Sequence, residues 1–109
     1  MPHLLLRGVP AEKLQAVSGP LAEELAVVCG CGADNFTMSC MQADNVYGYE
    51  GDASFAFIEV GWFERGQEAR GQFAETVTNC VRRLGVREVE IVFHAYREDS
   101  YYINGKPAG

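Results

Sequence analysis

Apolar residues that recur three or four positions apart predict two helices, over residues 11–29 and 67–84. Gly30 and Gly85 follow these segments and are suited to end them, because glycine tolerates the left-handed backbone of a helix C-terminus. The predicted buried stripes are Leu14, Val17, Leu21, Leu25 and Val28 in the first helix, and Phe73, Val77, Cys80, Val81 and Leu84 in the second.

Four shorter apolar runs predict β-strands, over residues 3–7, 36–43, 55–63 and 89–96. The run over 55–63 places bulky side chains on both faces, so we expect it at the centre of a sheet. Residues 44–54 are rich in glycine and polar residues and predict an irregular loop. Near the C-terminus, Asn104-Gly105 predicts the tight turn of a short hairpin.

The order strand-helix-strand occurs twice, which predicts an α+β fold built from two β-α-β units in a single domain over residues 1–109. Right-handed crossovers place both helices on one face of a four-stranded mixed sheet. The other face then carries apolar side chains of the third strand without a cover, and large bare apolar patches are rare on monomers. We therefore expect identical subunits to bury these faces against one another in a closed ring.

Composition and charge argue against several classes of partner. The formal net charge is −6, so the dense basic cluster that binds a nucleic-acid backbone is missing. The sequence shows neither a membrane span nor a signal peptide, and we expect a cytoplasmic protein. The four cysteines are expected to be reduced thiols, and the spacing in Cys29-Gly30-Cys31 fits neither a zinc site nor a redox pair. We therefore predict no metal and no cofactor.

Several short motifs together resemble one superfamily. They are the start Met1-Pro2-His3-Leu4, the step Arg7-Gly8-Val9, the segment from Trp62 to Glu68 and the tail from Tyr101 to Gly105. In these motifs and in the order of its elements, the chain resembles the tautomerase superfamily, in particular the branch of macrophage migration inhibitory factor and an uncharacterised bacterial tautomerase-like family. The resemblance implies a homotrimer with an active site near each N-terminus, at a subunit boundary.

Pro2 is the residue that the resemblance implies as general base, through the amine that removal of Met1 exposes. The chemistry is physically sound, because a secondary amine in an apolar pocket has its charged form disfavoured and its pKa lowered. Such an amine can accept a proton from a carbon next to a carbonyl group. The alternative is that Pro2 is only a small second residue that permits methionine removal.

Three further residues are candidates for contacts to the substrate. Val60 matches, by resemblance, the position whose backbone lines the family pocket, and Phe63 would supply an apolar wall. Arg65, at the turn into the second helix, would hold a carboxylate together with free backbone N–H groups. A surface ion pair of Arg65 with Glu64 or Glu68 is the alternative.

The chain departs from the family pattern where the relatives recognise their substrates. Neutral Thr37 stands where 4-oxalocrotonate tautomerase has an arginine. Glu90 and Val92 stand where the branch of macrophage migration inhibitory factor has a tyrosine and an asparagine. Substrate recognition by those enzymes therefore does not carry over to this chain.

Glu59 and the two histidines belong to the predicted strands. Glu59 is expected among aromatic side chains, either as a second acid or base or in an interface ion pair with Arg7. His3 and His94 are interpreted as surface or interface residues, with a role in proton transfer as the alternative.

Two functions are consistent with these residues. The first is a tautomerase-like isomerase that moves a proton in a small keto or enol acid, with Pro2 as base and Arg65 as anchor. The second is a non-catalytic homotrimer on the same scaffold that binds a ligand or another protein. Pro2 favours the first function, and the missing arginines favour the second.

Overall fold

The computed structural model describes residues 2–48 and 54–108. Met1 and the middle of the loop expected over 44–54 lie outside the described residues. The main elements are β1 (His3–Arg7), α1 (Ala11–Cys29), β2 (Thr37–Met41), β3 (Phe55–Trp62), α2 (Gln67–Arg83) and β4 (Glu88–Ala95). Short 3-10 helices η1 (Ala33–Asn35) and η2 (Glu98–Ser100) and strands β5 (Tyr102–Ile103) and β6 (Lys106–Pro107) complete the chain.

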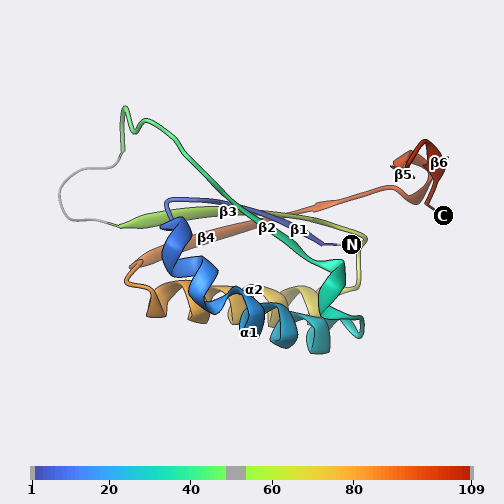
Figure 1. Ribbon diagram of the computed structural model, residues 1–109, viewed down its shortest axis with the longest axis horizontal. Coiled ribbons are helices and arrows are strands. Elements are labelled where there is room, and N and C mark those ends of the chain that lie inside the picture. Colours follow the sequence, from blue (N-terminus) through green and yellow to red (C-terminus); the bar gives the residue numbers. More distant parts are fainter. Residues whose placement is uncertain (1, 49–53, 109) are drawn as a thin grey trace.

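The four long strands form one mixed sheet in the order β2-β1-β3-β4. β1 runs parallel to β2 and antiparallel to β3, and β3 runs parallel to β4. Both helices lie on the same face of this sheet, α1 beside α2 (Figure 1). The predicted fold, with two β-α-β units and a four-stranded mixed sheet, is therefore confirmed.

The predicted elements are present, and their ends differ by one or two residues. β2 spans Thr37–Met41 and is shorter than the predicted 36–43. Phe63 and Tyr96 lie just beyond β3 and β4, so these two rings are free to turn toward the end of the sheet. The predicted tail hairpin is also present, with Asn104 and Gly105 at φ angles of 53° and 81° between β5 and β6.

The core lies between the sheet and the two helices. Alternate residues of β1 and β3 point into it, because successive side chains of a strand point to opposite faces. The residues with 0 to 3% exposure are Leu4, Leu6, Ala56, Ile58, Val60 and Trp62 from the sheet, and Leu14, Leu21, Leu25, Phe73, Val77 and Val81 from the helices. The stripes predicted from the helical spacing therefore face the core.

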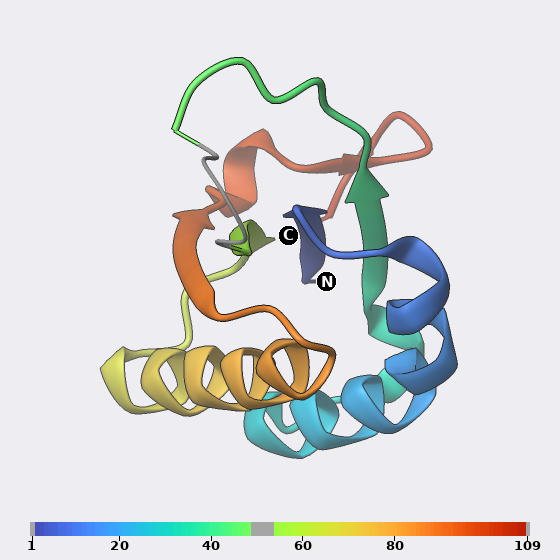
Figure 2. The same cartoon turned by 90° about the vertical axis from the view of Figure 1, so that its left-hand side faces the viewer.

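The opposite face of the sheet is open. Among the residues described, helices α1 and α2 lie on one side only, while the segment after β2 and the tail lie on the other (Figure 2). Leu5 of β1 and Met41 of β2 are 41% and 53% exposed on this open face. The uncovered apolar surface expected from the crossovers is thus observed in the single chain.

Candidate functional site

Pro2 lies at the start of β1, on the side of the sheet that the helices cover. Its ring is exposed by less than 2%, and its carbonyl oxygen accepts the N–H of Thr37 at 3.1 Å. The antiparallel register pairs His3 with Gly61 and Leu4 with Val60, so its continuation places Pro2 opposite Trp62. Side chains in such cross-strand positions lie within about 5 Å at their β-carbons. Pro2 and Trp62 are therefore neighbours at this end of the core.

Trp62 belongs to a buried cluster of aromatic rings. Its ring centroid lies 5.3 Å from that of Phe73 and 4.8 Å from that of Phe93, and Phe36 lies 6.3 Å from Phe73. The indole N–H is buried and has no hydrogen-bond partner within the described ranges. The cluster gives the Pro2 end of β1 an apolar surrounding, which disfavours the charged form of an amine placed there.

From the sequence, Trp62 was interpreted as a bulky strand residue and as the start of a resemblance motif, and it was not identified as a site residue. The sequence did contain one indication. Trp62 is the single tryptophan of the chain and lies in a strand expected to be buried, where an indole N–H usually has a hydrogen-bond partner.

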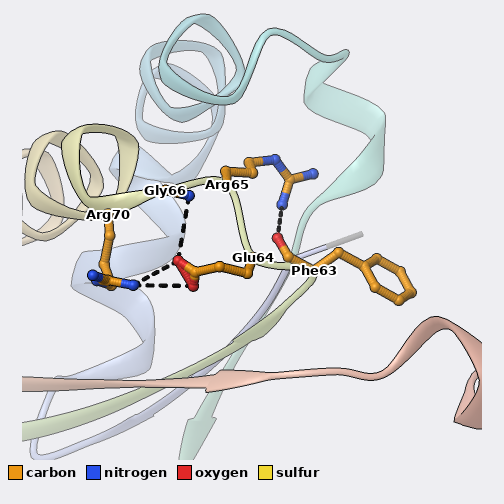
Figure 3. A network of polar contacts seen from close by, with 5 residues as sticks. All are labelled: Phe63, Glu64, Arg65, Gly66 and Arg70. Atoms are coloured by element: carbon orange, nitrogen blue, oxygen red, sulfur yellow. Dashed lines mark hydrogen bonds and ion pairs between the residues drawn. The ribbon is translucent and has the colours of Figure 1, made fainter.

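Arg65 is half-buried and lies over the ring of Trp62. Its Nη1 donates a hydrogen bond to the carbonyl oxygen of Phe63 at 2.8 Å, and its guanidinium carbon is 5.3 Å from the Trp62 ring centroid. The surface pairing of Arg65 with Glu64 or Glu68 is wrong. Glu64 instead accepts two hydrogen bonds from Arg70, at 2.6 and 3.0 Å (Figure 3).

The backbone N–H of Gly66 is also engaged by Glu64, at 3.3 Å. Gly66 is the residue before α2, and its N–H is one of the backbone donors that we expected to hold a carboxylate together with Arg65. The carboxylate of Glu64 thus accepts this N–H and also neutralises the charge of Arg70 (Figure 3). In the part of the chain that the structure describes, Arg65 has no carboxylate partner.

Cys29, at the end of α1, lies close enough to Arg65 for the positive charge to affect the pKa of its thiol. Burial raises the pKa of the Cys29 thiol, and the positive charge of Arg65 acts in the opposite direction. The thiol is therefore neutral at neutral pH, so it neither supplies a counter-charge for Arg65 nor acts as a ready nucleophile.

Phe63 faces a second aromatic cluster, which lies on the open side of the sheet. Its ring centroid is 5.1 Å from that of Tyr101 and 5.9 Å from that of Tyr96. His3 bonds Thr37 through Nδ1 at 2.6 Å and Tyr101 through Nε2 at 2.8 Å. Burial, and then the neighbouring Tyr101, raise the pKa of Tyr96. The tail is thus fixed against the start of β1, and Phe63 forms part of that contact.

Gly61 of β3 lies beneath Tyr96, where an added β-carbon would meet the phenol ring and its hydroxyl group. We expect Gly61→Ala to displace Tyr96 from Phe63 and Tyr101 and to cost about 1–3 kcal/mol of stability, measured by urea unfolding. In a Tyr96→Ala background the clash is absent, so the same change should cost close to nothing. An equal cost in both backgrounds would contradict this explanation.

Val60 lies deeper in the sheet than the other candidates. Its side chain is fully buried in the core, and its backbone pairs with Leu4 on one side and Phe93 on the other. The structure thus brings Pro2 and Arg65 close to Trp62 at one end of the sheet. Phe63 lies at the same end but faces the open side, and Val60 lies further along the strand.

Glu59 and His94 form a pair on the open face, with His94 Nε2 3.0 Å from Glu59 Oε1. Within the described chain Arg7 does not pair with Glu59, since it is opposite Phe57 in the register and lies over that ring at 5.4 Å. The ion pair expected between Glu59 and Arg7 across an interface stays a prediction. Glu90 lies on the same face of the sheet, where it is the β4 partner of Phe57 in the register. A hollow of about 210 Å³ is lined here by His3, Leu5, Glu59, Gly61, His94 and Tyr96.

Residues 2–48 and 54–108 contain no group of three or more His, Cys, Asp or Glu side chains arranged to hold a metal ion. Within the same residues, no helix is both long enough and apolar enough to cross a membrane.

Comparisons with solved structures place the fold. A DUF1904 domain from Sebaldella termitidis is 35% identical, with a TM-score of 0.86 over 96% of this chain and 97% of that one. Macrophage migration inhibitory factor from Toxoplasma gondii is 12% identical, with a TM-score of 0.77 and coverage of 95% and 97%. A fused 4-OT, described as a symmetric trimer, is 15% identical, with a TM-score of 0.76 and coverage of 95% and 93%. The predicted resemblance to the tautomerase superfamily is confirmed at the level of the fold.

A search of curated proteins gave no match for this sequence. The family described as "Domain of unknown function (DUF1904)" matches residues 1–107, which is nearly the whole chain. The match over that length, together with the Sebaldella termitidis structure, shows that the chain belongs to the DUF1904 family.

Proposed function

We propose that the protein, once Met1 is removed, is a tautomerase-like isomerase that moves a proton in a small keto or enol acid. The observation that carries the proposal is the position of Arg65, a half-buried cation without a carboxylate partner in the described chain, over the ring that neighbours Pro2. A base and an anion anchor on either side of one apolar ring suit a small acid that has both a labile proton and a carboxylate.

In the ketonisation direction, the Pro2 nitrogen takes the hydroxyl proton of the enol, and the resulting ammonium group delivers a proton to the carbon of the double bond. The enol oxygen becomes a carbonyl oxygen, the carbon gains one C–H bond, and the amine is regenerated. Arg65 holds the carboxylate, and the apolar surrounding of Pro2 keeps the amine unprotonated between turnovers. The pyrrolidine ring, which contains the nitrogen, restricts the direction of the lone pair.

The proposal is tested by intact-mass measurement of the native protein and by an assay of phenylenolpyruvate ketonisation. We expect a mass without Met1 and a rate above that in buffer. Retention of Met1 in the cell would contradict the proposal, because the Pro2 nitrogen would then be an amide. A processed protein that leaves the rate unchanged would exclude this substrate class.

We also propose a homotrimer in the cytoplasm. The open face supports assembly through exposed Leu5 and Met41, and the fused 4-OT of the same fold is described as a symmetric trimer. We expect light scattering to give three times the chain mass. Leu5→Glu should lower that mass by placing a charge on the open face, whereas Val27→Glu, at an 83% exposed position of α1, should leave it unchanged. A native protein that stays monomeric would contradict the proposal.

The non-catalytic homotrimer remains the second candidate function. It is favoured by the burial of the Pro2 ring, which is exposed by less than 2%. Under this alternative the same trimer would bind a small acid or another protein without turnover. A processed, trimeric protein that binds a keto acid and does not change the rate of its tautomerisation would support it.

A further inference from the structure

The buried N–H of Trp62 lacks an acceptor. Its Nε1 is inaccessible to solvent and makes no hydrogen bond with residues 2–48 or 54–108. The rings of Phe73 and Phe93 and the guanidinium group of Arg65 surround the indole, and none of these groups is a conventional hydrogen-bond acceptor. Most buried polar groups in native proteins have a partner, so this exception calls for an explanation.

Arg65, which lies over the Trp62 ring, has no carboxylate partner among the described residues. Its recorded hydrogen bond goes to a neutral carbonyl, that of Phe63. The acidic residue next to it in the sequence, Glu64, is held by Arg70 and by the N–H of Gly66 (Figure 3). The Trp62 indole and the guanidinium lying over its face therefore carry two kinds of donor, one of them charged, without a negative group from the described chain.

We infer that Trp62 Nε1 is the second donor for the substrate carboxylate, which would bridge the N–H edge of the Trp62 indole and the Arg65 guanidinium that lies over the face of the same ring. A carboxylate has two oxygens, so it can satisfy the indole N–H with one and the guanidinium with the other. The inference rests on the proposed function, which supplies the substrate class. It also requires processing, because the proposed function needs the free amine of Pro2. Trp62 is then a positioning residue that selects acids over neutral compounds.

The inference predicts a direct signal, because a chain with one tryptophan gives one indole N–H resonance. The processed, ¹⁵N-labelled protein is titrated with 3-phenylpropionate, an unreactive acid, and in parallel with 3-phenylpropanol, which has the same ring without a carboxylate. We expect the indole proton to move downfield and to saturate with the acid only. An indole signal that the acid leaves in place, or that both compounds shift alike, would overturn the inference.

A variant gives the second measurement. Trp62→Phe keeps an aromatic ring and removes the N–H, so the dissociation constant for 3-phenylpropionate should rise about 10- to 100-fold, as expected for the loss of a hydrogen bond to a charged group. Phe36→Leu is the matched control, since it trims another ring of the same cluster without removing a donor. Equal affinities for Trp62→Phe and native protein would overturn the inference. If Trp62→Phe does not fold, the titration of the native protein decides alone.

The two proposals fail separately. A saturating indole shift in a protein that does not accelerate ketonisation would support the carboxylate site and contradict the isomerase. Ketonisation by native protein, with an unshifted indole resonance, would support the isomerase and overturn the role of Trp62.

Discussion

Replacing Pro2 with alanine is expected to lower kcat for phenylenolpyruvate ketonisation by about 10²-fold, the lower end of the usual effect of a positioned general base. Removal of Met1 from this variant leaves a primary amine. That amine can still accept a proton, but it rotates freely about its bond to the α-carbon and no longer holds its lone pair in one direction. The rate is measured by the loss of enol absorbance, with thermal unfolding as a check on the fold.

Comparison with Pro2→Leu distinguishes the contribution of the free amine from that of the proline ring. A large second residue blocks removal of Met1, so the nitrogen of residue 2 stays an amide without basicity, and the rate should fall to that of buffer. The order native, Pro2→Ala, Pro2→Leu in decreasing rate is the expected outcome. Equal rates for native protein and Pro2→Ala, with both chains processed, would show that the base lies elsewhere in the molecule.

Replacing Phe73 with alanine should cost about 3–5 kcal/mol of unfolding free energy, the usual effect of removing a buried aromatic ring. Phe73 is fully buried in α2 and contacts three rings, those of Phe36, Trp62 and Phe93. Its loss leaves a cavity between α2 and the strands that carry Trp62 and Phe93. Urea unfolding measures the change, and all variants are compared at one protomer concentration, because assembly raises apparent stability.

Val27→Ala is the control for this prediction. Val27 lies on α1 and is 83% exposed, so its truncation should change the unfolding free energy by less than about 0.5 kcal/mol. A cost below about 1 kcal/mol for Phe73→Ala would contradict the view that this cluster holds α2 onto the sheet.

The candidate site could be predicted from the sequence only in part. Pro2 was identified from the resemblance, and Phe63 and Arg65 from their residue types and their place at the end of the third strand. The structure places all three at the same end of the sheet. Trp62 was missed as a neighbour of Pro2, because their proximity depends on the antiparallel register of β1 and β3, whose strands are about fifty residues apart in the chain.

The partners of two acidic residues within the chain also depend on the tertiary structure. Glu64 is next to Arg65 in the sequence, yet it pairs with Arg70, because the chain turns into α2 between them and brings the first turn of the helix to Glu64. Glu59 pairs with His94 rather than Arg7, because the register sets Arg7 against the ring of Phe57. Proximity along the chain, or a shared sheet face, does not specify a partner.

By itself the sequence determined the local elements and their order, because the period of apolar residues states which face of each helix or strand must leave water. It thereby determined the α+β class and the open face of the sheet. Only the tertiary structure decided which polar groups keep a partner, leaving the Trp62 N–H and the Arg65 charge unmatched within the described chain. The period of apolar residues along the sequence indicates which side chains are buried. Hydrogen bonds and ion pairs depend instead on the pairing register of the strands and on the path of each turn.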